Sequence, residues 1–393
     1  MTAGATSHSG AGERILLTGA TGFLGREILH VLVRGRPEAR LLLLARGTAD
    51  QSAAQRLDGI LERRYDPDER ESVRRRIEVV AADTSAPRCA LSERDWTAAA
   101  DGVTRVIHAA AAVRFDAPAQ EARRANTGGA RNLLELAAEA SRRGSLLAFS
   151  HVSTAFVAGE RAGLVREEEL EQGQRFRNTY ERTKYEAEIL VRERMRELPA
   201  LILRPSIVVG DSRSGVTTSF HTMYWPLRVY AKRRWRMVPG RPETPIDMVP
   251  VDFVAEAAAH LTFEPKAVGR TLHLCAGPSR STTIGEITAV ASRFFQVPPP
   301  RFVEPGVFLA LLRPLLFATL WGSRRRILRK GAFYRPYLNM QLEFDTAQAD
   351  SLLAPSGIRP PNVMDYLERL FAYCLETDWG RRHDPTPPPA SQS

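Results

Sequence analysis

A tyrosine and a lysine stand four residues apart, at Tyr180 and Lys184, in a segment predicted to be helical over 179–198. A spacing of four places both side chains on one face of a helix. An ammonium group beside a phenol favours the phenolate and lowers the tyrosine pKa, and such a tyrosine can exchange a proton with a carbonyl oxygen as hydride moves. Because the chain has only four lysines, chance rarely produces this pair. The pattern predicts reduction or oxidation coupled to proton transfer, and a solvated helical pair is the alternative.

Two hydroxyl side chains, Ser153 and Thr154, follow a predicted strand over 146–150 and precede Tyr180 by about 26 residues. A hydroxyl in this place could hydrogen-bond the substrate oxygen beside the tyrosine. Hydroxyls at strand ends also form turns. The spacing alone does not choose between the two residues or between the two roles.

Glycines recur at every third position between a predicted strand over 14–18 and a predicted helix over 26–34. The motif reads Thr18-Gly19-Ala20-Thr21-Gly22-Phe23-Leu24-Gly25. Glycine lets the backbone approach a pyrophosphate closely, and the helix N-terminus supplies N–H groups and a positive dipole end. The context predicts dinucleotide binding, with an ordinary glycine turn as the alternative.

The residue after the second strand, predicted over 41–44, indicates which dinucleotide binds. NAD enzymes usually hold an acidic residue there, but this chain has Arg46, with Arg56 one short helix further on. A guanidinium suits a 2′-phosphate, so the prediction is NADP(H), with solvated arginines as the alternative. Asp83 follows the third strand and could accept a hydrogen bond from adenine, or simply cap its loop.

Alternation of apolar strands and amphipathic helices predicts an α/β fold, a Rossmann-type doubly wound parallel sheet with a smaller, mainly helical C-terminal substrate lobe. Further returns to the sheet are expected near 249–251 and 272–274. The predicted division is a disordered N-terminus over 1–12, a cofactor domain over 13–280 with a substrate-lobe insertion at about 211–248, the C-terminal lobe over 281–382, and a disordered tail over 383–393.

The composition is that of a globular chain, with 44% hydrophobic and 25% charged residues among 393. This balance excludes a wholly disordered, collagen-like or disulfide-scaffold protein. The net charge of +10 comes almost entirely from arginine, and no nucleic-acid module accompanies it. Three scattered cysteines predict reduced thiols and no metal site. No signal peptide or spanning segment is evident, which predicts a cytoplasmic protein.

Two basic stretches adjoin apolar or aromatic residues. The apolar segment 307–321 is followed by the cluster Arg324–Lys330, and it predicts either a core or lid helix, which we favour because Arg313 and Pro314 interrupt it, or a peripheral membrane contact. The other stretch places Trp225, Tyr230 and Trp235 among Arg228, Lys232, Arg233 and Arg234. It could bind the phosphates of coenzyme A or of a carrier-protein arm.

Together, the glycine motif, the Tyr180/Lys184 pair and the helix beginning Asn126-Thr127-Gly128-Gly129 resemble the extended short-chain dehydrogenase/reductases. Further phrases are similar to the branch of fatty acyl-CoA reductases and thioester reductases, which includes the terminal domain of carboxylic acid reductases. They are His108-Ala109-Ala110-Ala111-Ala112-Val113-Arg114-Phe115-Asp116, Val152-Ser153-Thr154-Ala155-Phe156-Val157, Asn178-Thr179-Tyr180 and Leu203-Arg204-Pro205-Ser206-Ile207-Val208.

The resemblance implies a role for each matching residue. Thr154 takes the hydroxyl role, Tyr180 donates the proton, and Lys184 contacts ribose and shifts the tyrosine pKa. The implied cofactor contacts are Thr18, Gly19, Thr21, Gly22, Phe23, Leu24 and Gly25 at the pyrophosphate, Arg46 and Arg56 at the 2′-phosphate, Asp83 and Thr84 near adenine, Ala110 and Ala111 along the cofactor, and Pro205 and Ser206 beside nicotinamide.

The implied activity is NADPH-dependent reduction of a fatty-acyl or carrier-bound thioester to an aldehyde, with further reduction to the alcohol left open. The expected partner is acyl-CoA or an acyl carrier protein. One alternative is an extended dehydrogenase acting on a ketone or alcohol, such as a sterol or a nucleotide sugar. Another is a protein that senses NADP without chemistry.

Overall fold

The computed structural model describes residues 12–115, 117–234, 237–319 and 321–382. The two predicted disordered tails, except for Gly12, and the residues Asp116 and Trp235 lie outside these ranges.

A seven-stranded sheet forms the centre of the protein, and all its neighbouring strands run parallel. The spatial order is β3-β2-β1-β4-β5-β7-β12. The bounds are β1 (Arg14–Thr18), β2 (Arg40–Ala45), β3 (Ile77–Ala81), β4 (Arg105–His108), β5 (Ala148–Val152), β7 (Ala200–Pro205) and β12 (Thr271–Leu274). This is the doubly wound order in which ligands bind beyond the carboxyl ends of the strands.

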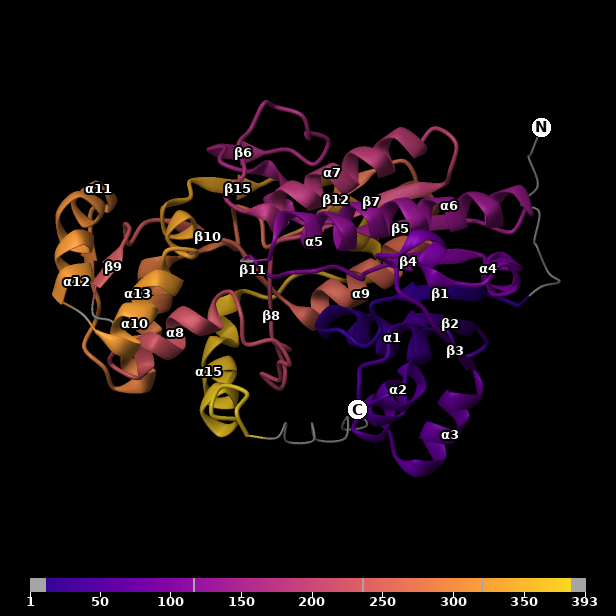
Figure 1. The fold of residues 1–393 in the computed structure, drawn as a ribbon, viewed down its shortest axis with the longest axis horizontal. Helices are drawn as coiled ribbons and strands as arrows, with labels where there is room; N and C mark the ends of the chain where they lie inside the picture. The colour runs from indigo at the N-terminus through magenta and orange to yellow at the C-terminus, as the bar shows by residue number, and fades with distance from the viewer. Residues whose placement is uncertain (1–11, 116, 235–236, 320, 383–393) are drawn as a thin grey trace.

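Helices cover both faces of the sheet (Figure 1). One face carries α1 (Phe23–Gly35), α2 (Ala53–Glu62), α3 (Pro67–Arg75) and α9 (Val251–Phe263), and the other carries α4 (Glu93–Ala100), α6 (Gly129–Arg142) and α7 (Thr179–Arg194). Strand β1 shows why both faces are apolar: Ile15 and Leu17 join the first core, and Leu16 between them joins the second. The predicted fold class is confirmed.

The remaining strands form four short pairs outside the main sheet. They are β6 (Gly163–Val165) with β15 (Leu342–Phe344), β8 (Ile207–Val209) with β11 (Met248–Pro250), β9 (Met237–Pro239) with β14 (Arg301–Val303), and β10 (Pro245–Ile246) with β13 (Thr282–Thr283). The predicted return to the sheet near 249–251 is therefore wrong, because β11 pairs with β8 instead. The return at β12 is confirmed.

A third core lies among these pairs and the later helices. It includes α8 (Tyr224–Ala231), α10 (Ile284–Phe295) and α15 (Leu367–Glu376). The helix α14 (Ala347–Leu353) instead packs Ala349, Leu352 and Leu353 into the core beneath the main sheet. The chain therefore returns to the main sheet after it has formed most of the third core.

The apolar segment at 307–321 is a surface element. It comprises α11 (Pro305–Val307), a π-helical stretch over Phe308–Leu312 and α12 (Arg313–Thr319), and α13 (Gly322–Gly331) follows it at one end of the molecule (Figure 1). Only Phe308 is buried within the described part of these first three elements. The segment is therefore not a core helix, whereas the lid helix that was favoured together with it stays a prediction.

All three cysteines are buried free thiols, as predicted. Across the described ranges, no helix is both long and apolar enough to cross a bilayer.

Candidate active site

The candidate catalytic residues meet where β5 ends and α7 begins. β5 ends at Val152, two residues later than predicted, so Ser153 and Thr154 follow it directly. α7 begins at Thr179, and the Asn178 side chain caps it by accepting a hydrogen bond from the Glu181 N–H at 3.0 Å. Tyr180 therefore lies in the first turn of α7, beside the residues that leave β5.

The two candidate hydroxyls have different partners. Ser153 donates a hydrogen bond to the buried carboxylate of Glu188, over 2.8 Å. The Thr154 side chain is instead hydrogen-bonded to the Tyr180 phenol. Thr154 also donates to the Pro205 carbonyl at 3.4 Å, which brings the end of β7 to the same place. Of the two, only Thr154 shares an interaction with the tyrosine.

Lys184 is almost fully buried one turn further along α7. Its Nζ donates to the Val152 carbonyl at 2.6 Å and lies 3.4 Å from Nε2 of His151. Burial lowers the pKa of Lys184 to about 8, although the carboxylate of Glu188 opposes this shift. The lysine is thus anchored to the strand that carries the hydroxyls.

The expected lowering of the tyrosine pKa is not found. Burial raises the pKa of Tyr180 to about 12, and the hydrogen bond with Thr154 offsets only part of that rise. Lys184 does not act as the expected neighbour because its ammonium group is directed at the Val152 carbonyl. We correct the prediction accordingly: in this structure desolvation controls the phenol.

The glycine motif has the tight geometry that a dinucleotide loop needs. Gly19 has a φ of +79°, and a Cβ there would lie 2.7 Å from the Ala110 nitrogen. A Cβ on Gly25 would lie 2.1 Å from the Gly19 carbonyl oxygen, so α1 packs directly on the turn. The first turn of α1 contains no acidic residue. An anion at this helix end would meet N–H groups and no opposing carboxylate, which fits a pyrophosphate.

Thr18 links the glycine loop to the end of β4 and the residues that follow it. Its hydroxyl accepts a hydrogen bond from the Ala110 N–H at 3.2 Å and lies 2.8 Å from Nδ1 of His108. Ala110 therefore lies beside the glycine turn, and the implied contact of Ala110 and Ala111 with the cofactor stays a prediction.

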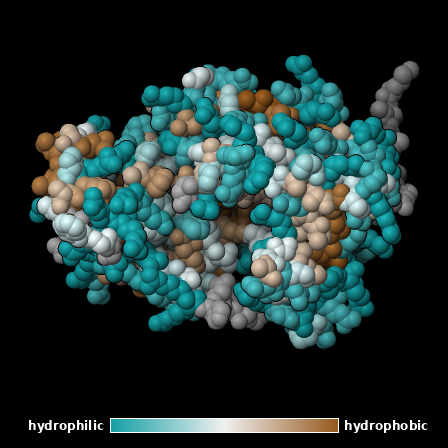
Figure 2. Space-filling view, viewed as in Figure 1, coloured by the Kyte–Doolittle hydropathy of each residue, from teal (hydrophilic) through white to brown (hydrophobic). Residues whose placement is uncertain are grey.

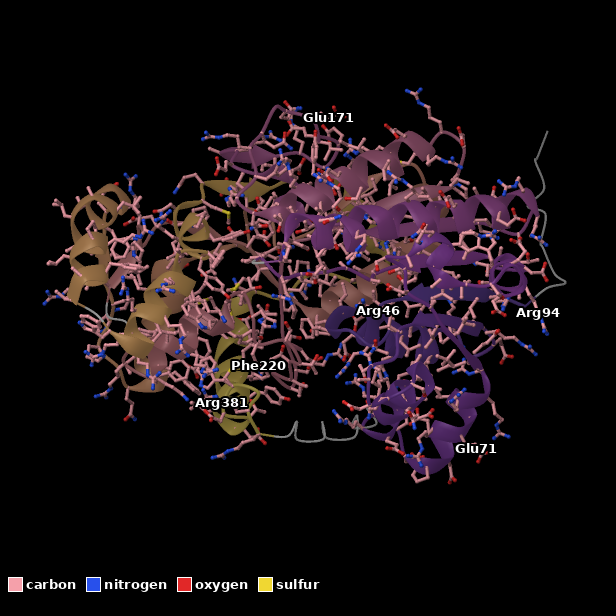
Figure 3. All side chains as sticks on the ribbon, viewed as in Figure 1. Arg46, Glu71, Arg94, Glu171, Phe220 and Arg381 are labelled. Carbon is pink, nitrogen blue, oxygen red and sulfur yellow. The ribbon has the colours of Figure 1, made fainter. Side chains whose placement is uncertain are left out.

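Arg46, Arg56 and Asp83 come together beyond β2 and β3. Arg56 donates to the Arg46 carbonyl at 2.6 Å, and the Arg46 guanidinium, 69% exposed, lies 3.9 Å from Asp83. In Figure 3 Arg46 lies toward the middle of the molecule, whereas Arg94 lies at its edge. Two cations at this place fit a 2′-phosphate.

Asp83 also caps its own loop, which was the second role predicted for it from the sequence. One of its oxygens accepts hydrogen bonds from the Ser85 N–H at 3.0 Å and the Ser85 hydroxyl at 2.8 Å. The Thr84 carbonyl accepts a hydrogen bond from Asn132 of α6 at 2.8 Å, so the same loop is tied to that helix.

An aromatic wall beside Tyr180 was not anticipated from the sequence. The Phe115 ring lies 6.0 Å from Tyr180 and stacks on Tyr337 at 5.4 Å, and Tyr334 stacks on Trp225 at 5.0 Å. Phe115 and Tyr334 are 6.4 Å apart, which joins the two pairs. The residues come from distant segments with no common spacing, so only their aromatic character was visible in the sequence.

Asn126 is another residue near the site, and its structural role was not predicted from the sequence. It lies in a π-helical turn over Arg124–Gly128, just before α6. Its side chain accepts from the Ala112 N–H at 2.8 Å and donates to the Thr183 hydroxyl at 2.9 Å. It thereby fixes the loop after β4 against α7, next to Lys184.

The basic and aromatic stretch after 224 is partly engaged within the chain. Trp225 belongs to the aromatic wall, Lys232 pairs with Asp378 at 3.1 Å, and Arg233 donates to the Gln296 carbonyl at 2.9 Å.

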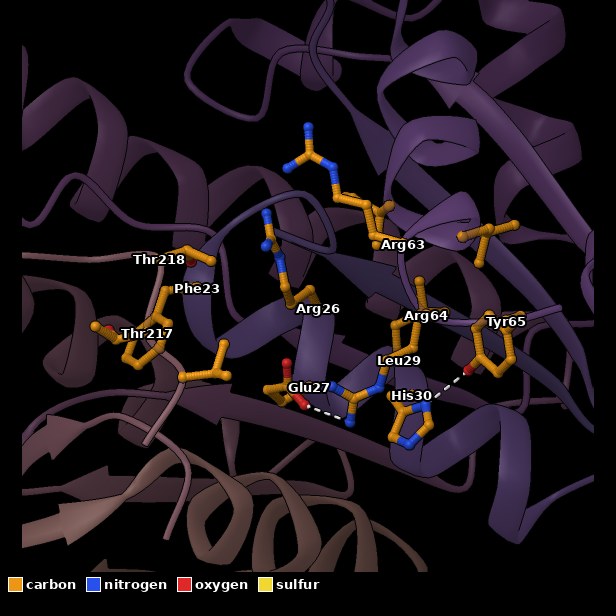
Figure 4. A pocket seen from close by; sticks show the side chains of 13 residues that line it. Phe23, Arg26, Glu27, Leu29, His30, Arg63, Arg64, Tyr65, Thr217 and Thr218 are labelled. Carbon is orange, nitrogen blue, oxygen red and sulfur yellow. Dashed lines mark hydrogen bonds and ion pairs between the residues drawn. The ribbon is translucent and has the colours of Figure 1, made fainter. Parts of the chain in front are cut away.

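One described pocket lies elsewhere, on the outer side of α1 (Figure 4). Its empty volume is about 660 Å³, and residues of α1, of the end of α2 and of the loop 216–218 line it. Figure 4 shows Glu27 paired with Arg64, at 3.2 Å, and His30 bonded to Tyr65, at 2.7 Å. None of Thr154, Tyr180 and Lys184 lines this pocket.

Comparison with known proteins gives a family match over most of the cofactor half. Residues 17–258 match the family described as male sterility protein. A linear gramicidin synthase of Brevibacillus parabrevis is 29% identical over 295 residues, which are 72% of this chain and 6% of that protein. Fatty acyl-CoA reductase 1 of Rattus norvegicus is 29% identical over 279 residues, or 63% of this chain and 54% of the relative. The chain thus spans only part of each relative.

Solved structures agree over nearly the whole chain. The terminal R domain from the myxalamid PKS-NRPS pathway has a TM-score of 0.80 at 26% identity, over 94% of this chain and 92% of that one. A thiolation-reductase di-domain of an archaeal non-ribosomal peptide synthetase shares the fold, with a TM-score of 0.73 at 21% identity over 93% of this chain and 76% of that one. The chain has a nicotinamide-cofactor domain, and it belongs to the male sterility protein family within the extended short-chain dehydrogenase/reductases.

Proposed function

We propose that this protein is an NADPH-dependent reductase of acyl thioesters, in which Thr154, Tyr180 and Lys184 perform the chemistry. The observation that carries the proposal is the hydrogen bond between Thr154, just after β5, and Tyr180, in the first turn of α7. A protein that only senses the cofactor has no need of this hydroxyl pair.

The chain's own residues would act on the thioester oxygen. A bound reduced nicotinamide would supply hydride to the carbonyl carbon. Tyr180 and Thr154 would hydrogen-bond the carbonyl oxygen, and Tyr180 would give it a proton as negative charge develops. The resulting hemithioacetal would break its C–S bond and release an aldehyde and a thiol. A second hydride and proton would convert the aldehyde to a primary alcohol.

Lys184 would hold the positive charge behind the tyrosine, and the resemblance gives it the ribose contact as well. Its ammonium group is fixed by the Val152 carbonyl. In this structure the fixed charge does not lower the pKa of the phenol, so Lys184 would act through the ribose contact and on the negative charge that develops at the substrate oxygen.

The choice of NADPH rests on Arg46 and Arg56. Their contact places two guanidinium groups at the end of β2, where an acidic residue would stand in an NAD enzyme. A 2′-phosphate can form charge-assisted hydrogen bonds with both.

The choice of an acyl substrate rests on the aromatic wall. Phe115, Tyr334, Tyr337 and Trp225 are half-buried, so they form an apolar surface beside Tyr180 that solvent still reaches. Such a surface suits a hydrocarbon chain better than a nucleotide sugar. Fatty acyl-CoA reductases and thiolation-reductase domains among the relatives support a thioester carried by coenzyme A or by a carrier protein.

The experiment is NADPH oxidation against a panel of acyl-CoAs, ketones and nucleotide sugars. We expect turnover with acyl-CoAs, and product analysis would identify aldehyde or alcohol. Turnover with ketones or nucleotide sugars alone would overturn the substrate assignment.

The matched variant is Tyr180→Phe. We expect it to lower kcat by at least about 100-fold, since general acid catalysis contributes on that order, while NADPH binding persists. Phe keeps the ring that packs on Phe115 and removes only the hydroxyl. Full activity in this variant would exclude Tyr180 as the proton donor.

A further inference from the structure

The surface over α11, α12 and α13 carries both exposed apolar side chains and a concentration of positive charge. Val307, Leu311, Leu315 and Trp321 are 46%, 67%, 60% and 79% exposed. Figure 2 shows hydrophobic residues gathered at the end of the molecule where Figure 1 places α11 and α12. We call this set, with the basic residues of α13, the helical tip.

The apolar residues of the helical tip form a stripe. Val307, Leu311 and Leu315 recur at intervals of four, which aligns them along one side of the helical segment. Phe308, on another side, is buried and faces Leu328 and Pro239 across a small cavity. The segment is therefore held to the protein by one side and presents the leucine stripe outward.

The charge of the helical tip has a single sign. Seven basic residues and no acidic residue occur between Pro305 and Leu342. They are Arg313, Arg324, Arg325, Arg326, Arg329, Lys330 and Arg335. Within the described ranges, none of the seven is joined to a carboxylate by an ion pair. This cationic surface is therefore not neutralised by the protein itself.

We propose that the helical tip binds a membrane surface that contains anionic lipid. Leucines and a tryptophan on a protruding helix can enter the interface between headgroups and acyl chains, where tryptophan is favoured. The flanking arginines would meet lipid phosphates at the same depth. A second copy of this chain would bring the same positive charge to the contact, so charge complementarity favours an anionic lipid surface.

The helical tip also adjoins the aromatic wall. The Lys330 ammonium of α13 lies 5.4 Å from the Trp225 ring, and Trp225 stacks on Tyr334. A membrane-bound tip would thus place the wall beside α13 close to the lipid surface. The binding itself stands on the exposed stripe and the charge, and it does not depend on the reductase activity proposed above.

Vesicle sedimentation tests the proposal. We expect the wild type to sediment with vesicles of phosphatidylcholine and phosphatidylglycerol, and much less with phosphatidylcholine alone. The double variant Leu311→Asp/Leu315→Asp should partition at least about tenfold less, because each leucine loses its burial in lipid. The triple variant Arg324→Gln/Arg326→Gln/Arg329→Gln should lose on the order of 100-fold, at about fivefold per basic residue.

Two matched controls separate the helical tip from general surface effects. Leu375→Asp changes another exposed leucine, 51% exposed on α15, and Arg175→Gln removes another exposed arginine. Both should sediment as the wild type does. Turnover of a short, water-soluble acyl thioester should stay unchanged in the Leu311→Asp/Leu315→Asp variant, since α12 and the π-helical stretch lie at the end of the molecule, away from α7 (Figure 1).

Three results would overturn the proposal. One is unchanged sedimentation of the leucine variant. Another is a wild-type dimer, seen by light scattering, that the leucine variant converts to a monomer, which would make the tip a contact between two copies. The third is binding of an acidic carrier protein to the tip with no binding to either kind of vesicle.

Discussion

Burial acts in opposite directions on the two residues that define the candidate site. It raises the pKa of Tyr180 to about 12 and lowers that of Lys184 to about 8. In water the two groups titrate close together, so the protein separates them and makes the lysine lose its proton first. Proton transfer at this site is therefore expected to depend on the charge of Lys184 over a range near neutral pH.

The alkaline limb of the pH profile should report this lysine. We expect kcat/KM to fall as pH rises through about 8, because Lys184 becomes neutral there. In Lys184→Arg the guanidinium stays charged, so any residual activity should keep its alkaline limb at a higher pH. The measurement is kcat/KM over the pH range in which the enzyme is stable. If the alkaline fall in kcat/KM occurs at the same pH in Lys184→Arg as in the wild type, a group other than Lys184 is responsible for it.

The same shift predicts a stability difference that needs no substrate. The unfolded chain holds the lysine proton up to about pH 10.5, whereas the native protein releases it from about pH 8. The unfolded state then binds more protons between these values, so the wild type should gain stability relative to Lys184→Met as pH rises through that window. Urea unfolding at both ends of the window measures the difference.

Arg46 and Arg56 should set the cofactor preference. Replacing either by Ala should raise KM for NADPH on the order of tenfold or more, because a charge-assisted contact with phosphate is lost. KM for NADH should change little. Arg94→Ala, at the edge of the molecule, serves as the control. Equal losses with both cofactors would show that the arginines act on the fold and not on the 2′-phosphate.

At the residue scale, the sequence showed which types of side chain could act at the site more clearly than which particular residue does so. The Tyr180/Lys184 spacing was readable because both lie on one helix. The spacing did not choose Thr154, which only the resemblance named, over Ser153, because the difference depends on Glu188, 35 residues beyond Ser153. The tyrosine pKa was misjudged for the same reason, since desolvation is created by segments far away in the chain.

At the scale of elements, a buried ion pair connects α7 to β7. Glu188 is fully buried and Arg204 is 1% exposed, and the arginine also donates to the carbonyls of Glu167 and Glu169. The carboxylate accepts a further hydrogen bond from Ser153. This network holds the helix that carries Tyr180 and Lys184 in a fixed position relative to the strand ends.

Breaking one half of this pair should be costly. Arg204→Met leaves the Glu188 charge buried without its main partner, and we expect a loss of about 3–5 kcal/mol in the free energy of unfolding. Arg204→Met/Glu188→Leu should lose less, because no fully buried charge remains unpaired, and Arg192, which also pairs with Glu188, is partly exposed. Urea denaturation of both variants gives the comparison. A double variant less stable than Arg204→Met would mean that the pair stabilises beyond the cost of burying it.

The central strands β1 and β2 were predictable because each is a short apolar run buried on both faces. The prediction placed β1 correctly. The paired strands outside the sheet have only two or three residues each, and their partners lie far away in sequence, so no local pattern indicates them. The core form of the prediction for 307–321 was wrong because hydrophobicity alone does not distinguish a core helix from an exposed one.

For the whole molecule, the net charge of +10 has more than one origin. Many arginines are paired on the surface with nearby carboxylates, as Arg123 is with Glu186 at 2.7 Å. The helical tip differs, because its basic residues lie in a stretch without acidic residues. Total charge was evident from composition, but the separation of paired from unpaired charge required the structure.

The contact of Tyr337 with α7 has a consequence for how the protein is made. The Tyr337 hydroxyl donates to the Glu181 carboxylate at 2.6 Å, and 156 positions separate the two residues. At a synthesis rate of about 5–20 residues per second, Tyr337 emerges from a ribosome roughly 10 to 30 seconds after Glu181. During that interval the glycine loop and the strands around it are already available for folding. The nascent chain could therefore bind a dinucleotide before the aromatic wall beside Tyr180 is complete.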